Sequence, residues 1–253
     1  MKIVACLHTD RGLVREKNED NFLFFGRTLP DLKAPFAAEQ TSGLTCPLLF
    51  GVFDGMGGIS AGEVASRMAA ETARRCFFEV PSIGGGVMER ICQSANCAIC
   101  GEMRRSGRRM GTTAAMLGFD RTGFTLCSLG DSAVFIFRQN RLVKISAEHT
   151  ERENYIRTHG SAPDGKKFRL TQHLGIFEEE MLLEPQIVPG RYHCGDRYLI
   201  CSDGLTDMLP PQRLEELFRA RGTLRGLAEN LMRGALQAGG RDNITLICME
   251  ITE

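Results

Sequence analysis

Four aspartates share one local setting, at the edge of an apolar segment that is typical of a β-strand. Asp54 follows "LLFGVF", Asp131 follows "LCSLG" and Asp203 follows "YLICS", each beside a glycine, whereas Asp242 precedes "NITLICME". A carboxylate at a strand end is held by a rigid scaffold, and a neighbouring glycine lets a ligand approach the backbone closely. An Asp-Gly turn explains each aspartate taken alone. Four together favour a shared role, because converging like charges need a counter-ion.

Hard divalent cations would supply that positive charge. Mg²⁺ and Mn²⁺ prefer carboxylate and carbonyl oxygens completed by water. None of the five histidines stands beside these acids in the sequence, so softer ligands are missing from the pattern. The four aspartates therefore predict a magnesium or manganese centre.

The segment "GLVREKNEDN" adds Arg15, Glu19 and Asp20 immediately before another predicted strand. Taken alone, this mixture of charges is typical of a solvated loop. Close to a metal centre it gains a second interpretation, because arginine is suited to bidentate recognition of phosphate. A carboxylate-bound metal pair with one arginine would form a site for phosphate esters.

The bulk composition excludes several classes of protein. The 31 basic and 31 acidic residues cancel, and neither sign forms a long block, so bulk charge gives no reason to expect a nucleic-acid or membrane partner. No segment resembles a signal peptide or approaches the roughly 18 apolar residues of a spanning helix, so we expect a cytoplasmic protein. Most of the ten cysteines lie in core-like segments and are expected to be reduced. Cys97 and Cys100 have the spacing of zinc ligands, but without a second pair we expect them to pack in a helix.

The order of predicted elements indicates an α+β fold. Strands are expected over residues 2–8, 21–25, 48–53, 112–119, 124–129, 133–138, 142–146, 197–202 and 243–251. Helices are expected over about 60–77, 87–105, 211–220 and 224–237, the first with a capping box from Ser60 to Glu63. Strands in runs with helix pairs between them favour antiparallel sheets over a doubly wound parallel sheet.

We expect a single domain over residues 1–253, because no linker or repeat divides the chain. The least regular segment, about 147–183, is predicted to be an exposed, flap-like insertion. It contains a second capping box from Thr150 to Glu153 and an "EEE" run at 178–180 that is expected to be solvent-exposed charge.

Seven motifs in order extend over nearly the whole chain: "GLVREKNEDN", "FGVFDGMGGISAGEVAS", "GTTAAML", "LGDS", "SAEHT", "CSDGLTD" and "GGRDNITL". This ordered set closely resembles the metal-dependent protein phosphatase (PPM) family, the type 2C serine/threonine phosphatases, in the compact form of its bacterial branch. The resemblance implies a four-layer αββα fold, in which a central sandwich of two antiparallel β-sheets has helices on both outer faces.

The resemblance also assigns roles to residues of this sequence. It implies that Asp54 bridges two metal ions, that the Gly55 carbonyl binds one of them, and that Asp203 and Asp242 hold the other. The remaining assignments are Glu19 for an acid that acts through a metal-bound water, Arg15 for phosphate binding, Asp131 with Asp203 for a third and weaker metal, and Asp20, Asp207 and Asn243 for support.

The activity implied by the resemblance is hydrolysis of phosphoserine and phosphothreonine in proteins. Two or three Mg²⁺ or Mn²⁺ ions would be the cofactors, and a metal-bridging hydroxide would attack phosphorus directly, without a phosphoenzyme. The partners would be phosphoproteins that a cognate serine/threonine kinase phosphorylates, and the protein would be a monomer.

Three positions depart from common versions of the family pattern. Met56 stands where many eukaryotic members have a histidine proposed as general acid, Ala133 stands where arginine is frequent, and Glu148 replaces an aspartate. Met56 is frequent in the bacterial branch, and it implies that water or another residue protonates the leaving group.

Two alternatives stay open. The chain could be a non-enzymatic scaffold, although inactive relatives typically lose metal-ligand acids that are present here. It could also hydrolyse small phosphate esters or nucleotides with the same centre. Nucleotide binding through a glycine-rich loop is discarded, because "DGMGG" lacks the Lys-Ser/Thr of a P-loop.

Overall fold

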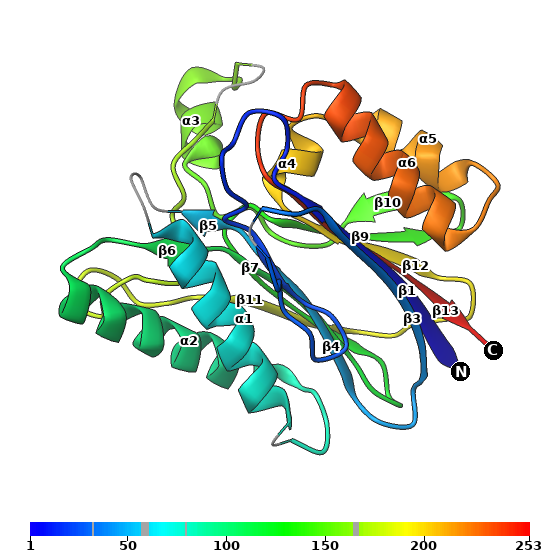
Figure 1. The fold of residues 1–253 in the computed structure, drawn as a ribbon, viewed down its shortest axis with the longest axis horizontal. Coiled ribbons are helices and arrows are strands. Elements are labelled where there is room, and N and C mark those ends of the chain that lie inside the picture. Colours follow the sequence, from blue (N-terminus) through cyan, green and yellow to red (C-terminus); the bar gives the residue numbers. More distant parts are fainter. Residues whose placement is uncertain (32, 57–60, 79, 164–166) are drawn as a thin grey trace.

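The computed structural model describes residues 1–31, 33–56, 61–78, 80–163 and 167–253, with Glu153 and Asn154 described in backbone only. Two large antiparallel sheets form its centre (Figure 1). The first sheet has the order β10 (Arg141–Lys144), β9 (Ala133–Arg138), β12 (Arg197–Cys201), β13 (Ile244–Thr252), β1 (Lys2–Asp10) and β3 (Phe36–Gly43). The second has the order β11 (Gln186–Gly190), β8 (Phe124–Leu129), β7 (Ala114–Phe119), β4 (Leu48–Phe53) and β2 (Asn21–Leu23). A short ribbon pairs β5 (Gly55–Met56) with β6 (Gly111–Thr112).

The two sheets pack face to face over an apolar layer. Side chains that alternate along the strands point into it, including Leu7 of β1, Phe50 of β4, Leu117 of β7 and Ile247 of β13. Each of these side chains is fully buried. The short apolar segments from which these strands were predicted supply the side chains of this layer.

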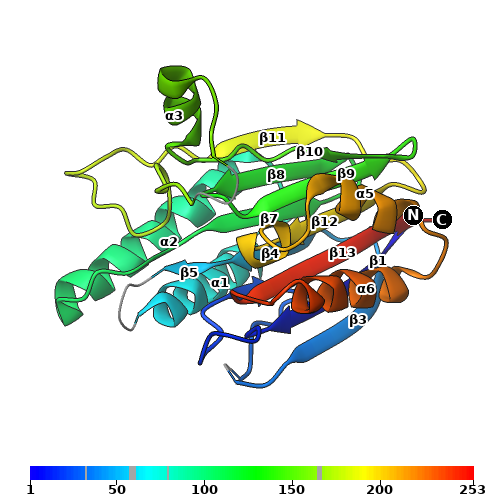
Figure 2. The ribbon, with the colours of Figure 1, turned by 90° about the horizontal axis from the view of Figure 1, so that it is seen from above.

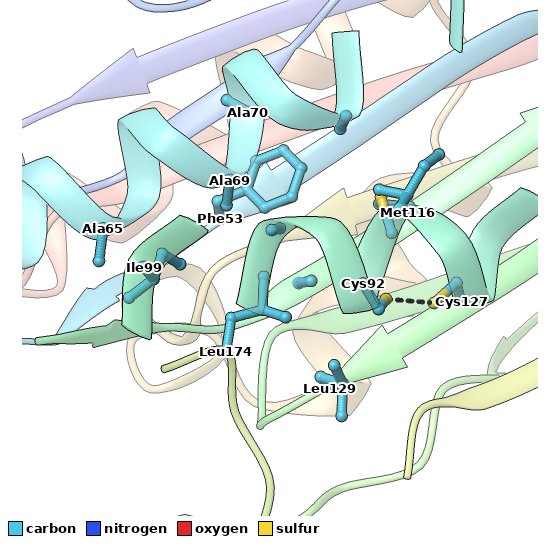
Figure 3. Packing of buried hydrophobic residues seen from close by; sticks show 14 of the residues in the cluster. Phe53, Ala65, Ala69, Ala70, Cys92, Ile99, Met116, Cys127, Leu129 and Leu174 are labelled. Carbon is cyan, nitrogen blue, oxygen red and sulfur yellow. Dashed lines mark hydrogen bonds between the residues drawn. The ribbon is translucent and has the colours of Figure 1, made fainter. Parts of the chain in front are cut away.

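Each outer face of the sandwich carries a helix pair (Figure 1). The helices α1 (Gly62–Phe78) and α2 (Gly85–Ser106) cover the second sheet, and α5 (Pro211–Arg219) and α6 (Leu224–Gln237) cover the first. Small residues of α1, such as Ala65 and Ala69, let the helix lie close to Phe53, and Cys92 of α2 contacts Cys127 of β8 at 3.4 Å between sulfurs (Figure 3). The predicted four-layer αββα fold is confirmed.

Among the described strands, three were not predicted from the sequence: the two-residue β5 and two strands at sheet edges, β3 and β11. β3 has the sequence "FAAEQTSG" and alternates between exposed and half-buried residues, so it lacks the apolar content of a central strand. β11 contains Pro189, which cannot donate a ladder hydrogen bond and is tolerated at an edge. Edge strands bury little side-chain surface, and the hydrophobic pattern is correspondingly weak.

The insertion is only partly exposed. Its helix α3 (Arg152–His159) projects from the sandwich (Figure 2), and Thr150 Oγ1 accepts a hydrogen bond from Arg152 N at 3.3 Å. The segment that follows returns to α2, where the side chain of Asn96 bonds the backbone of Gly175 and Ile176. The prediction of an exposed insertion is therefore wrong for this return segment, where Leu174 and Ile176 are buried.

Several smaller expectations have definite outcomes. Glu178, Glu179 and Glu180 are exposed as expected, and the last two also form ion pairs with Arg104 and Arg109.

Cys100 is buried, but Cys97 is exposed, so the predicted packing role of Cys97 is wrong. The Ser60 half of the first capping box and the Glu153 side chain of the second lie outside the described residues. Among the helices described, none is both long enough and apolar enough to cross a membrane.

Candidate metal centre

A cavity of about 580 Å³ opens where the ends of several strands meet. Its walls come from the loop after β1, the junction of β4 and β5, the turn between β8 and β9, the insertion, and the segments around Asp203 and Asp242. Figure 2 shows α3, α4 (Asp203–Thr206) and β5 toward the end of the sandwich opposite the two termini. Eight of the ten candidate residues line the cavity: Arg15, Glu19, Asp54, Gly55, Asp131, Asp203, Asp242 and Asn243. The other two, Asp20 and Asp207, do not line it.

Asn243 holds the loop that carries Arg15 and Glu19. Its amide nitrogen donates to the carbonyls of Arg11 at 2.9 Å and Lys17 at 2.8 Å, and its amide oxygen accepts from Glu19 N at 2.7 Å. The predicted supporting residue therefore contacts loop backbone. One side chain beside Asp242 thus bonds the backbone of the β1–β2 loop at three positions.

Two threonines hold the backbone of Asp54 at the end of β4. Thr113 Oγ1 accepts from Asp54 N at 2.9 Å, and the Asp54 carbonyl accepts from Thr113 N at 2.9 Å and from Thr112 Oγ1 at 2.8 Å. The motif "GTTAAML" belonged to the family pattern, but no role was assigned to its threonines. Hydroxyl residues at a strand end are the signal that could have indicated this contact.

Gly55 is required by close packing. A Cβ atom at this position would lie 2.3 Å from the carbonyl oxygen of Gly62 and 2.5 Å from that of Glu19. The glycine thus allows the start of α1 and the Glu19 segment to close on the metal-centre loop. The sequence predicts that glycine beside Asp54 makes room for a ligand, whereas the atoms nearest to the missing Cβ belong to the protein's own backbone.

Asp203 occupies the first turn of α4, directly after β12. The next residue, Gly204, packs so tightly that a Cβ would lie 1.9 Å from the carbonyl oxygen of Asn243. Because Asn243 follows Asp242, this contact brings the Asp203 segment against the Asp242 segment. The glycine of this "DG" pair thus lets the segments of two candidate ligands pack together.

Lys167, which the sequence analysis missed, reaches these acids from the insertion. Its Nζ lies 2.7 Å from Asp203 Oδ2, 3.1 Å from Asp207 Oδ2 and 3.5 Å from Asp242 Oδ2. Although partial burial alone would lower it, the pKa of Lys167 is raised by Asp203 and Asp207, so the ammonium stays charged. The segment "DGKKF" had no motif that could reveal this contact.

Arg15 approaches Asp242 from the β1–β2 loop. Its Nη2 donates to Asp242 Oδ2 at 2.8 Å, and its side chain is half exposed, so the guanidinium retains free donors toward the cavity. Glu19 lines the same cavity, where burial first and Glu63 second raise its pKa. The resemblance placed both residues at the site, and the structure brings both to its wall.

Burial and mutual repulsion disfavour the ionised forms of the acids. The pKa of Asp54 is raised well above its ordinary value by burial, then by the charges of Asp20, Asp203, Asp131 and Asp242. Burial and then Asp203 raise the pKa of Asp131 to about 6. Carboxylates in this condition are stabilised by a nearby cation.

Asp20 is fully buried behind the cavity wall. Its Oδ2 accepts from Ser202 Oγ at 2.8 Å, whereas Oδ1 has no hydrogen-bond partner among the described residues. Burial raises the pKa of Asp20 to about 7, partly offset by hydrogen bonds from Thr245 and Ser202. An unpaired buried carboxylate oxygen is costly, so a positive charge nearby would stabilise the ionised form of Asp20.

The donor set fits a hard divalent cation in its chemistry, because it consists of carboxylate oxygens and the ammonium of Lys167 already stands among three of them. Within the described ranges, no three acidic, histidine or cysteine side chains lie close enough together to hold an ion as they stand. Metal binding at this cavity therefore requires side chains to converge.

The three departures from the family pattern have separate environments. Met56 lines the cavity and is half-buried, Ala133 is fully buried at the start of β9, and Glu148 pairs with Lys144 at 3.3 Å. Only Met56 is therefore in a position to contact a molecule in the cavity.

The two-sheet sandwich is similar over its whole length to solved structures of serine/threonine phosphatases. The family described as "Protein phosphatase 2C" matches residues 37–238. The chain belongs to the protein phosphatase 2C family.

Individual relatives are similar in sequence to this chain over almost its whole length. The serine/threonine phosphatase stp of Listeria monocytogenes is 28% identical over 260 residues, which cover 97% of this chain and 95% of that protein. The serine/threonine protein phosphatase PstP of Mycobacterium tuberculosis is 27% identical over 253 residues, which cover 97% of this chain and 44% of that protein. The crystal structure of the PstP catalytic domain in complex with two manganese ions superposes with a TM-score of 0.79 at 26% identity and covers 100% of both chains.

Proposed function

We propose that this protein is a metal-dependent serine/threonine protein phosphatase that removes phosphate from phosphoserine and phosphothreonine in proteins. The observation that carries the proposal is the convergence of four strand-end aspartates and one arginine on a single cavity of about 580 Å³. The phosphatase names of the relatives and the two manganese ions in the PstP complex support both the reaction and the cofactor.

In this proposal the acids have different roles. Asp54 and the Gly55 carbonyl would hold one side of a two-ion centre, Asp203 and Asp242 the other, and Glu19 would act through water. Asp131 is proposed for a third, weaker ion. Bound Mg²⁺ or Mn²⁺ would supply an activated water and neutralise phosphate charge, without a covalent intermediate on the protein.

The protein's own residues position the candidate ligands and supply positive charge for the phosphate. Thr112 and Thr113 fix the Asp54 backbone, and Asn243 fixes the loop of Arg15. We infer that Arg15 turns from Asp242 toward the substrate, where its planar fork can donate two hydrogen bonds to a phosphate. Met56 carries no titratable proton, so the leaving group takes its proton from water or from another residue.

The wider setting is also a proposal. We infer that residues 1–253 form one catalytic domain, in which the insertion at about 147–183 borders the substrate site. The substrates would be phosphoproteins of a cognate serine/threonine kinase, and the protein would act as a cytoplasmic monomer.

A metal titration with phosphopeptide and nucleotide substrates tests the proposal. The metal-free protein is expected to be inactive, to regain turnover with Mn²⁺ or Mg²⁺, and to prefer phosphoserine and phosphothreonine peptides over nucleotides. Asp54→Asn and Asp203→Asn should remain folded and be nearly inactive, whereas Asp31→Asn, on an exposed loop, should match the wild type.

The outcomes separate the alternatives. Faster turnover of nucleotides than of phosphopeptides would assign the centre to small phosphate esters. Metal binding without turnover of any phosphate ester would support a scaffold role instead. Equal turnover by Asp54→Asn and the wild type would contradict the proposed ligand set.

A further inference from the structure

Lys167 holds three acids of the proposed metal centre at once. Its ammonium lies 2.7 Å from Asp203, 3.1 Å from Asp207 and 3.5 Å from Asp242. Lys167 belongs to the insertion, Asp203 and Asp207 to α4 and its C-cap, and Asp242 to the segment before β13, so the contact joins three segments around one positive charge. No other ammonium or guanidinium in the described part of the chain contacts more than one of these acids.

The position of this ammonium is that of a counter-ion. Asp203, Asp207 and Asp242 would repel one another without positive charge, and lysine carries a compact point charge on a flexible stem. Arg15 contacts the same Oδ2 of Asp242 at 2.8 Å, so that oxygen is shared between two side-chain cations. An oxygen occupied in this way is not free to bind a metal ion.

We propose that Lys167 is a built-in counter-cation that sets the metal affinity of this centre. Its ammonium neutralises the three carboxylates in the metal-free protein, and a divalent cation binds Asp203 and Asp242 only by displacing it. The inference rests on the proposed metal site but not on the phosphatase reaction.

The exchange requires little movement of the backbone. Thr150 and Leu170 form a β-bridge at the base of the insertion, and Glu151 N and Thr171 N donate to the carbonyls of Arg169 and His149 at 2.9 and 2.8 Å. These bonds anchor the chain close to Lys167. The lysine side chain is 60% exposed, so rotation of its own stem toward solvent can release the acids.

Competition links metal affinity to the position of Lys167. A metal ion that binds only the lysine-displaced state has its apparent affinity reduced by the fraction of molecules in that state. The lysine contact therefore stabilises the metal-free protein and weakens metal binding by the same free energy.

Calorimetric titration of Mn²⁺ into metal-stripped protein tests the first half of this link. Lys167→Met removes the charge while keeping an unbranched stem, and it is expected to tighten Mn²⁺ binding by about tenfold, equivalent to about 1.4 kcal/mol. Lys144→Met is the matched control, because Lys144 pairs with Glu148 and does not line the cavity. The control should bind Mn²⁺ as the wild type does.

Thermal unfolding of the same proteins tests the second half. In chelator, Lys167→Met should melt below the wild type by about 2–4 °C, because three acids lose their counter-ion. In saturating Mn²⁺ the two melting temperatures should coincide. A purely structural role for Lys167 would lower the melting temperature in both conditions, and a role only in substrate binding would leave Mn²⁺ affinity unchanged.

Three results would overturn the inference. Unchanged or weaker Mn²⁺ binding by Lys167→Met excludes competition, and so does a melting difference that persists in saturating Mn²⁺. If the wild type binds no divalent cation at all, the proposed metal centre is wrong and the inference falls with it. The first two results leave the proposed function intact, so the two failures are distinguishable.

Discussion

Arg15 donates a hydrogen bond to Asp242 Oδ2 at 2.8 Å, although 227 positions separate the two residues in the sequence. The contact joins the β1–β2 loop to the segment before β13 at the lining of the cavity. It also shows the guanidinium already pointing at the acids around which a phosphate would bind. The pair thus joins the two chemical parts of the site, anion recognition and cation binding.

Arg15→Ala is expected to weaken phosphate binding. Charged hydrogen bonds of this kind contribute about 1.5–3 kcal/mol, so KM for a phosphopeptide should rise by about 10- to 100-fold. Arg15→Lys should recover only part of the loss, because a point charge cannot bind phosphate bidentately. Steady-state kinetics will measure both, with Arg11→Ala as the control from the same loop but outside the cavity lining. Unchanged KM and kcat in Arg15→Ala would remove Arg15 from the site.

Thr113→Val is expected to reduce turnover while the protein remains folded. Valine keeps the shape of the side chain but leaves the N–H of Asp54 without its acceptor, at a cost of about 1–3 kcal/mol. The displaced Asp54 should weaken Mn²⁺ binding in calorimetry as well as kcat. Thr113→Ser, which retains the hydroxyl, should restore both, and failure of that rescue would argue against the hydrogen bond. Thr125→Val, in β8, is the control.

Gly204→Ala is expected to disrupt the centre by steric contact. The new Cβ would lie 1.9 Å from the carbonyl oxygen of Asn243, so α4 and Asp203 must move. Loss of activity should accompany a lower melting temperature. Gly101→Ala is the control, because Gly101 lies inside α2 with open space at its Cβ position. Helix propensity predicts that this control gains about 0.5–1 kcal/mol, and a similar gain in Gly204→Ala would contradict the packing argument.

Asp196 is expected to make stability depend on acid pH. Burial alone would raise its pKa, but hydrogen bonds from Arg138 at 2.6 and 2.8 Å and from His193 N at 2.6 Å lower it below the ordinary value of 3.8. A depressed carboxyl pKa contributes stability above the unfolded value, and that stability is lost as pH falls through the folded pKa. Asp196→Asn should therefore lower the free energy of unfolding by about 1–2 kcal/mol near neutral pH. Below about pH 4, the melting temperature of this variant should depend less on pH than that of the wild type. An unchanged pH profile would contradict this role.

The central strands and the two helix pairs could be predicted from the sequence, because the strands are short apolar segments and the helices carry an amphipathic pattern. Helix α6 (Leu224–Gln237) matches its expected range, since a complete amphipathic stripe is a local property. β3 and β11 escaped prediction because an edge strand buries little and is defined by its neighbour's hydrogen bonds.

The candidate site, like the fold, has some features that the sequence predicts and others that it does not. The sequence by itself determined which acids stand at strand ends, and the order of motifs indicated the family. Tertiary structure alone decided that Asn243 clamps the Arg15 loop, that Thr113 holds Asp54 and that Lys167 reaches Asp203. These contacts join segments that are 36 to 226 positions apart. Secondary-structure propensity and hydrophobic periodicity are local properties, so they do not predict which distant side chains meet.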